Sequence, residues 1–300
     1  MLLKSIVYSG NNEEIITGLD EIKYNLEVKG IKLGISEVIE NTTHFIKIFC
    51  GQGDFTRRAE INFNLYLSML IYKFLCREFF SKKIDGFINE TYFFLKEEEI
   101  SEVKNLCIKG FLGEGKIKDE SEVYCINRKN SIIKKITDFI SENDEINIQG
   151  YIRFRIKEME EDFESIVDKI IEKYMVEKEY DEFIKLLKYF VDIQECKIDE
   201  VNIFASKSGE YRISDRHGND ITDKMSEGIN ATGFNSGSTK DDLIMSGLIT
   251  LAPKKVIIHC LDYFTNKELV ETIKKVFEGR VDFCDSCKSC KELMKNLIKN

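Results

Sequence analysis

Three cysteines near the end of the chain have the residue type and the spacing that could do chemistry. Cys284, Cys287 and Cys290 form a C-x-x-C-x-x-C pattern. Three thiols at this spacing could bind zinc or ligate an iron–sulfur cluster. Zinc sites generally use two separated pairs of ligands, so a fourth ligand would have to come from elsewhere in the chain. A thiol-redox role of the C-x-x-C type is a second interpretation, and cysteines without a role in a reducing cytosol are a third.

The residues before these cysteines supply candidates for the fourth ligand. Residues 255–284 predict a buried strand, a helix and a last strand. In a β-α-β unit with the usual parallel crossover, both strands end at the same edge of the sheet. This would bring His259 or Cys260 towards Cys284, at the edge where open α/β sheets usually bind ligands. We therefore expect a metal site formed by Cys284, Cys287, Cys290 and Cys260, with His259 as the alternative fourth ligand.

A histidine beside carboxylates, His217 in the segment 215–220, could serve acid–base chemistry. The same segment consists of standard turn residues between two predicted strands, and we favour a turn. Nucleophilic catalysis by a Cys–His pair needs a positioned base, and the three histidines lie far apart in the sequence. We assign no catalytic residue, and the sequence favours a protein without enzymatic activity.

Glycine-rich segments are the candidates for binding phosphate groups. Residues 51–54 lead into a helix with two arginines but lack the third glycine of the dinucleotide pattern. In residues 110–116 and 233–240 neither the glycines nor the lysine have P-loop spacing. Arg153 and Arg155 could place an anion at a helix start, but their i, i+2 spacing points them to different sides. We interpret these segments as turns and assign no cofactor-binding residue.

The charge balance and the apolar runs limit the classes of partner. The 300 residues carry a formal net charge of −9, and both signs are mixed along most of the chain. Nucleic-acid phosphates and anionic lipids attract such a protein poorly, so we expect no nucleic-acid partner. The apolar run at the start of the chain is short and is interrupted by Lys4, so we expect no signal peptide. Residues 65–80 are too short and too charged to span a membrane. We expect a cytoplasmic protein whose nine cysteines are mostly reduced.

The hydrophobic patterns predict a mixed α/β (α+β) fold. The first 50 residues have the pattern of a β-α-β-β unit, and a helix that is apolar around much of its circumference follows. From Ile152 to Tyr174 apolar residues recur every three or four positions, which places them on one helix face. After residue 197 the period is two, and a β-hairpin precedes an α-β-α-β arrangement. Helices are expected at residues 13–30, 59–84, 90–106, 131–141, 147–176, 179–192, 241–251 and 266–277, with a short one at the C-terminus. Strands are expected at residues 2–8, 32–39, 44–50, 201–205, 211–213, 255–260 and 280–284, with a short one near Ile221.

Shifts in composition divide the chain into four parts. Residues 1–110 form an N-terminal α/β portion with the buried helix, and the glycine-rich, charged residues 111–130 form a linker. Residues 131–195 form a central helical region, and residues 196–300 form a C-terminal α/β portion with a cysteine-rich tail. The charged residues 177–179 are either a tight helix–helix corner or a continuation of one helix. We expect the central helices to tie the two α/β portions together.

Three stretches of sequence carry a resemblance to a known family. Residues 151–204 read YIRFRIKEMEEDFESIVDKIIEKYMVEKEYDEFIKLLKYFVDIQECKIDEVNIF. Residues 241–259 read DDLIMSGLITLAPKKVIIH, and residues 268–277 read ELVETIKKVF. In these stretches the chain resembles the YtxC-like sporulation proteins of endospore-forming Firmicutes.

The resemblance implies a function class and no chemistry. It implies a cytosolic protein linked to sporulation, with no catalytic residue to carry over to this sequence. We therefore expect a non-enzymatic protein that acts through protein partners. The alternative, carried by the cysteine pattern, is a metal-binding protein with zinc or an iron–sulfur cluster, or a thiol-redox protein.

Overall fold

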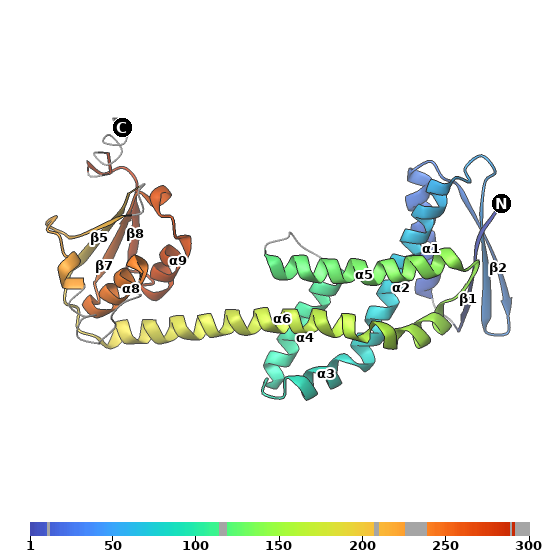
Figure 1. Ribbon diagram of the computed structural model, residues 1–300, viewed down its shortest axis with the longest axis horizontal. Helices are drawn as coiled ribbons and strands as arrows, with labels where there is room; N and C mark the ends of the chain where they lie inside the picture. The colour runs from blue at the N-terminus through green and yellow to red at the C-terminus, as the bar shows by residue number, and fades with distance from the viewer. Residues whose placement is uncertain (11–12, 114–118, 207–209, 226–238, 289, 292–300) are drawn as a thin grey trace. The chain divides into compact units, whose positions relative to one another are not determined.

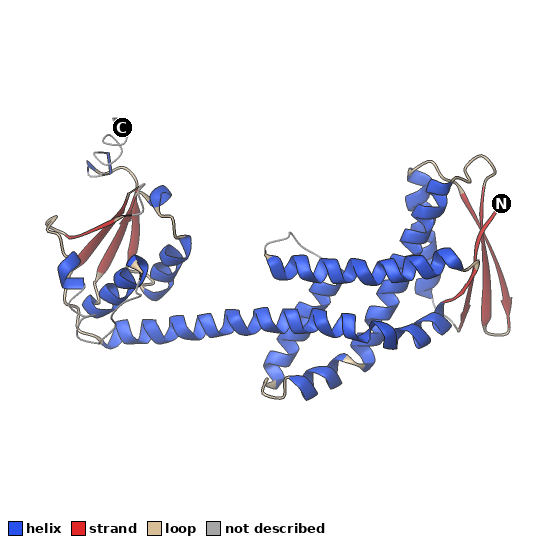
Figure 2. Cartoon of the chain, in the orientation of Figure 1, coloured by secondary structure: helices blue, strands red, loops and turns tan. Residues whose placement is uncertain are grey.

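A computed structural model describes the chain apart from residues 11–12, 114–118, 207–209, 226–238, 289 and 292–300 (Figure 1). The chain forms two compact units, Met1–Met175 and Val176–Asn300. Figure 2 shows that both units combine helices with a sheet. The first unit contains β1 (Leu2–Ser9), α1 (Glu13–Val28), β2 (Leu33–Glu40), β3 (Thr43–Cys50), α2 (Arg57–Lys82), α3 (Ile84–Thr91), α4 (Glu97–Leu112), α5 (Glu120–Glu142), β4 (Glu145–Asn147) and the first part of α6 (Ile148–Ile193). The second contains the end of α6, β5 (Glu200–Ala205), β6 (Tyr211–Asp215), α8 (Lys240–Leu251), β7 (Lys255–His259), the 3-10 helix η1 (Leu261–Tyr263), α9 (Lys267–Val276) and β8 (Val281–Cys284).

The sheet of the first unit has the strand order β2-β3-β1-β4. β3 pairs antiparallel with both β1 and β2, and the short β4 adds to β1 in parallel, with Ile146 opposite Ile6. Side chains alternate across a strand, so one face of β3 directs Ile46, Ile48 and Cys50 into the core. The predicted β-α-β-β unit is therefore present, and β4 extends it from a distant part of the chain.

α2 is the buried helix of the first unit. Its start is capped by Thr56, whose Oγ1 accepts a hydrogen bond from the Ala59 N–H at 3.1 Å. Phe79 packs on Phe111 of α4 and Phe163 of α6, with ring centroids 6.0 and 5.1 Å apart. All three phenylalanine side chains are fully buried, so α2, α4 and α6 share one aromatic core. The apolar circumference expected for this helix is only partly buried, since three of its apolar residues are exposed, namely Ile61, Leu65 and Met69.

α6 is one continuous helix, which decides between the two alternatives that the sequence allowed at residues 177–179, a helix–helix corner or a continuation. It runs without interruption through residues 177–179, and the border between the two units falls within it. Asn147 caps its start, because Asn147 Oδ1 accepts a hydrogen bond from the Gly150 N–H at 2.8 Å. The charged residues at 177–179 are good helix formers, and nothing in their type requires a turn.

Two other helix predictions differ from the structure. The helix predicted at residues 90–106 is divided into α3 and α4, and α3 already begins at Ile84, so Gly86 lies inside a helix and is not a break. α5 begins at Glu120, within the segment predicted as a linker, because the Asp119 carboxylate accepts a hydrogen bond from the Glu122 N–H and caps the helix. A run of charged residues thus contains the cap of a helix, Asp119, and need not be a linker.

The sheet of the second unit has the strand order β6-β5-β7-β8, and Figure 1 shows β5, β7 and β8 side by side. β7 is parallel to both β5 and β8, and β6 forms the predicted antiparallel hairpin with β5. The expected short strand near Ile221 is reduced to one bridge between Ser214 and Asp220. One face of the sheet packs on α8, α9 and the end of α6, in a core that is separate from that of the first unit. The opposite face carries the residues of the candidate site.

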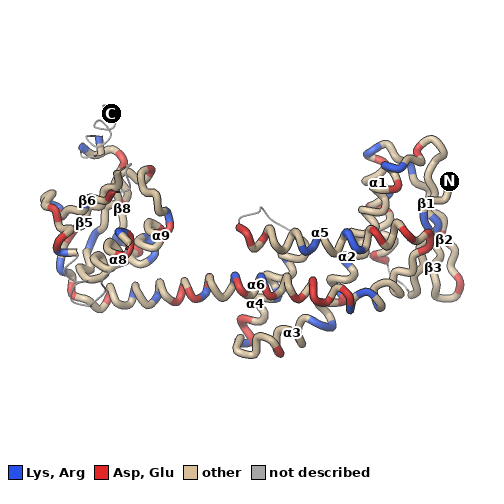
Figure 3. Tube along the Cα trace, in the orientation of Figure 1, with Lys and Arg blue, Asp and Glu red and all other residues tan. Residues whose placement is uncertain are grey.

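The mixed α/β (α+β) fold predicted from the sequence is confirmed. In the described part of the chain, no helix combines the length and the apolar character needed to cross a membrane. Figure 3 shows acidic and basic residues interspersed along α5 and α6.

Candidate metal centre

The register of β7 and β8 brings the first two candidate ligands together. His259 is the last residue of β7 and lies directly opposite Cys284, the last residue of β8. Paired residues in a sheet point to the same face, so both side chains leave the sheet on one side. The backbone N–H of Cys260 then donates to the Cys284 carbonyl at 3.1 Å and holds the two strand ends together. The parallel crossover expected from the sequence is present.

The other two cysteines turn back over these strand ends. His259 Nδ1 lies 3.6 Å from Cys287 Sγ and 3.4 Å from Cys290 Sγ. The two Sγ atoms lie 3.4 Å apart, and the backbone N–H of Cys290 points at Cys287 Sγ. The ligand atoms of His259, Cys284, Cys287 and Cys290 all lie within 4.8 Å of one another. Three thiols and one imidazole nitrogen therefore converge on one point.

The three distances among His259 Nδ1, Cys287 Sγ and Cys290 Sγ, 3.4 to 3.6 Å, suit a single tetrahedral ion, and Cys284 Sγ lies within 4.8 Å of these atoms. With Zn–S bonds near ~2.3 Å and Zn–N bonds near ~2.0 Å, the ligand atoms of a tetrahedral site stand about 3.5 to 3.8 Å apart. A Cys₃His set is one of the usual structural zinc sets, and soft thiolates select zinc over magnesium or calcium. In an iron–sulfur cluster the ligands bind different iron atoms and stand farther apart. The geometry therefore fits one zinc ion better than a cluster.

The surroundings of His259 keep its ring neutral and fixed. Burial lowers the pKa of His259, against the opposing effect of the Glu200 and Asp285 carboxylates. The Phe204 ring stacks on the imidazole, with centroids 4.1 Å apart and planes inclined by 14°. On the other side of the ring, Nε2 lies 3.0 Å from Asn202 Oδ1. A neutral imidazole has one nitrogen with a free lone pair, as a metal ligand requires.

Cys260, predicted as the fourth ligand, stays beside the group and is not one of its four members. It is buried, and its φ of 55° lies in the left-handed region, which turns the chain away from β7. Burial raises the pKa of the Cys260 thiol, and burial likewise raises the pKa of Cys290, so both are protonated at neutral pH without a metal. Coordination by Cys260 stays a prediction. Of the two candidates for the fourth ligand, His259 is the one whose ring nitrogen lies with the three thiols.

The remaining motifs are explained by local structure where they are described. The Asp215 carboxylate accepts hydrogen bonds from the backbone of His217 and Asn219, which is a turn as predicted. Arg155 forms an ion pair with Glu158 on the same helix. Gly113 ends α4 with a φ of 70°, in the left-handed conformation that glycine favours. Residues 114–118 and 233–238 of the glycine-rich segments lie outside the described part of the chain.

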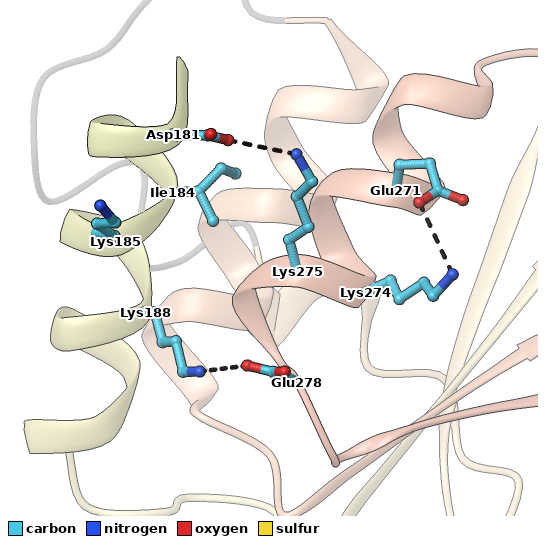
Figure 4. A pocket seen from close by; sticks show the side chains of 8 residues that line it. All are labelled: Asp181, Ile184, Lys185, Lys188, Glu271, Lys274, Lys275 and Glu278. Atoms are coloured by element: carbon cyan, nitrogen blue, oxygen red, sulfur yellow. Dashed lines mark hydrogen bonds and ion pairs between the residues drawn. The ribbon is translucent and has the colours of Figure 1, made fainter. Parts of the chain in front are cut away.

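A groove of about 500 Å³ lies in the second unit, between the end of α6 and α9 (Figure 4). Figure 4 shows three ion pairs in it, Lys275 with Asp181, Lys188 with Glu278, and Lys274 with Glu271. Six of the seven charged residues that line the groove are thus used in pairing, and the apolar lining residue Ile184 is buried. We interpret this groove as a packing seam with charged rims.

The chain is similar to a known protein family and to a curated protein of that family. A family model described as the YtxC-like family matches residues 65–282. The chain belongs to the YtxC-like family. A curated relative, "Uncharacterized protein YtxC" of Bacillus subtilis (strain 168), is 24% identical over 222 residues, which are 72% of this chain and 75% of that protein. No solved structure gives a significant match. The family resemblance expected from residues 151–204 is confirmed.

The family match covers only part of the candidate site. It includes Asn202 and His259 but ends at residue 282, before the three cysteines. Family membership therefore says nothing about Cys284, Cys287 and Cys290. Asn202 is not among the residues predicted from the sequence, although a polar residue among the apolar residues 201–205 is a usable signal.

Proposed function

We propose that the second unit of this YtxC-like protein binds one zinc ion through His259 Nδ1 and the thiolates of Cys284, Cys287 and Cys290. The observation that carries the proposal is the convergence of four ligand atoms within 4.8 Å of one another. Four protein ligands fill a tetrahedral shell and leave no open position for a substrate, which favours a structural role. The ion would fix the turn after β8 to the ends of β7 and β8.

A titration with Co²⁺ tests this proposal. Cobalt replaces zinc in tetrahedral thiolate sites and gives intense d–d and sulfur-to-metal charge-transfer absorption. We expect these bands to saturate at one Co²⁺ per chain and to disappear when Zn²⁺ is added. The double variant Cys287→Ser/Cys290→Ser should lose the bands, whereas Cys196→Ser, at an exposed cysteine outside the group, should keep them. Equal spectra for the two variants would contradict the proposal.

A thiol-redox role is the second candidate, because the Sγ atoms of Cys287 and Cys290 lie only 3.4 Å apart. It predicts that protein purified in air carries a Cys287–Cys290 disulfide and is two hydrogens lighter by mass spectrometry. Zinc-bound thiolates would instead stay reduced and resist alkylation until the metal is removed. The two candidates therefore differ in one mass measurement.

At the level of the cell, we propose a cytoplasmic protein that is linked to sporulation and acts by binding protein partners. Membership of the YtxC-like family supports the link, and the closed ligand shell favours binding over catalysis. Turnover of a nucleotide or a thiol substrate by the purified protein, abolished by a single substitution, would contradict the non-enzymatic part of this proposal.

A further inference from the structure

Asn202 is placed by the sheet to contact the imidazole of His259. β5 and β7 are parallel neighbours, with Phe204 opposite His259 and Asn202 opposite Ile257. Asn202 and Phe204 are two residues apart and share one face, so Asn202 is the diagonal neighbour of His259. The Asn202 side chain is buried, and its Oδ1 lies 3.0 Å from His259 Nε2.

The orientation of the Asn202 amide is fixed by its other end. Asn202 Nδ2 donates to Glu200 Oε1 at 3.0 Å and to the Asp215 carbonyl oxygen at 3.3 Å. Both partners are acceptors only, so the NH₂ group must face them. The carbonyl oxygen of the amide therefore faces His259, and a carbonyl oxygen can only accept a hydrogen bond.

An acceptor at Nε2 decides the tautomer of a neutral imidazole. Nε2 must carry the proton that it donates to Asn202 Oδ1, and Nδ1 then keeps its lone pair. Nδ1 is the nitrogen that lies 3.4 Å from Cys290 Sγ and 3.6 Å from Cys287 Sγ. Hydrogen bonds of this kind orient metal-binding histidines and raise their basicity.

We infer that Asn202 is a positioning residue for the metal site, because its amide oxygen holds His259 in the Nε2-protonated tautomer and directs the Nδ1 lone pair at the three cysteines. Glu200 and the Asp215 carbonyl fix the orientation of the Asn202 amide. The amide oxygen in turn fixes the tautomer of the imidazole, whose Nδ1 faces the cysteines. The inference rests on the proposed zinc-binding function, but its first consequence, the tautomer, exists without metal.

The tautomer is measured on the wild-type protein without metal. In reduced, chelator-treated full-length protein at neutral pH, long-range ¹H–¹⁵N correlation spectra distinguish a protonated from an unprotonated ring nitrogen. We expect His259 to show a protonated Nε2 and an unprotonated Nδ1. The chain has only three histidines, so His44→Gln and His217→Gln assign the signals. A protonated Nδ1 in this spectrum would overturn the inference, whatever the metal content of the protein.

Removal of the acceptor is the second arm of the test. Asn202→Leu should weaken Zn²⁺ binding about 10- to 100-fold, as measured by competition with a chromophoric chelator, and should mix the tautomers of His259. Ser214→Ala is the matched control, since Ser214 is buried directly opposite Asn202 on β6. This control should bind Zn²⁺ as the wild type does. Equal losses in both variants would mean that Asn202 acts only through general stability.

An exchange of functional groups provides the rescue. Asn202→Asp alone places a carboxylate against Glu200 Oε1 and should weaken binding. The double variant Asn202→Asp/Glu200→Gln restores a donor at residue 200 and keeps an acceptor at His259 Nε2, so Zn²⁺ affinity should return at least to the wild-type value. Failure of this rescue in folded protein would contradict the inference. Wild-type protein that binds no Zn²⁺, yet shows the Nε2-protonated tautomer, would contradict the proposed function and leave the role of Asn202 intact.

Discussion

Which of two adjacent residues faces the cysteines depends on the pleat of β7. His259 and Cys260 are neighbours in sequence, and either could complete the C-x-x-C-x-x-C pattern by its chemistry. Successive residues of a strand point to opposite faces, so only the register against β8 decides between them. The structure pairs His259 with Cys284, and Cys260 follows the end of β7 in the left-handed conformation, beside the group of four. Sequence alone shows the motif and the edge of the sheet, but it cannot show this register.

Buried cysteines of the first unit should be inert towards alkylation. Burial raises the pKa of Cys76 and of Cys107 to about 12, so their reactive thiolate form is scarce at neutral pH. With iodoacetamide and peptide mass spectrometry, we expect fast modification of the exposed Cys196 and negligible modification of these two. All three should react at similar rates in denaturant. Fast labelling of Cys107 in native protein would contradict its burial.

Substitutions of a buried and an exposed phenylalanine of α6 distinguish the contribution of core packing to stability from that of helix formation. Phe163 is 0% exposed and stacks on Phe79 and Phe111, whereas Phe154 on the same helix is 76% exposed. Phe163→Ala should lower the free energy of unfolding by about 3–5 kcal/mol, because it leaves a cavity in an aromatic cluster. Phe154→Ala should change it by less than ~0.5 kcal/mol. Denaturant unfolding measures both, and equal effects would contradict the packing of α6.

At the scale of elements, local patterns predicted the types of element better than their ends. Apolar spacing predicts α9 and the helical character of the residues in α6, because these elements bury one clear face. The starts of α5 and α3 were missed, because capping by Asp119 and the break at Lys83 depend on contacts that a charge run does not reveal. β4 was also missed, since a strand of three residues forms only when β1 lies beside it.

Metal removal should loosen one sheet edge and leave the other unit unchanged. β8 is a strand of four residues at the edge of its sheet, so it has little stability of its own. Chelation of the proposed ion should speed amide exchange in β8 by on the order of tenfold or more, since ~1.4 kcal/mol of local stability is a factor of ten. Exchange in β1 and β3 is the internal control. Hydrogen-exchange mass spectrometry that finds no change in β8 would contradict a structural role for the ion.

At the scale of the whole molecule, the two units differ in the size of their cores and in which of them contains the candidate site. The first has the larger core, and α2, α4 and α6 are joined in it by aromatic packing. The second holds the candidate site on the sheet face opposite its own core. The family was predictable from long amphipathic segments, which are specific to a fold. The chemistry was predictable only as a motif, because the residues that complete it come from β5 and β7.

The proposed site should matter for the cellular role of the protein. In an endospore-forming host, deletion of the gene should lower the yield of heat-resistant spores. We expect the wild-type chain and Cys196→Ser to restore that yield, and Cys287→Ser/Cys290→Ser to restore it poorly at equal protein level. Full restoration by the double variant would show that the proposed sporulation role does not depend on the proposed metal site.

Elemental analysis of the full chain, purified without an affinity metal under aerobic and anaerobic conditions, tests the central claim most directly. The convergence of His259, Cys284, Cys287 and Cys290 predicts one zinc ion per chain in both preparations. The Cys287→Ser/Cys290→Ser variant, purified in parallel, should contain almost none. Absence of stoichiometric metal from both wild-type preparations, or iron with inorganic sulfide in place of zinc, would contradict the claim.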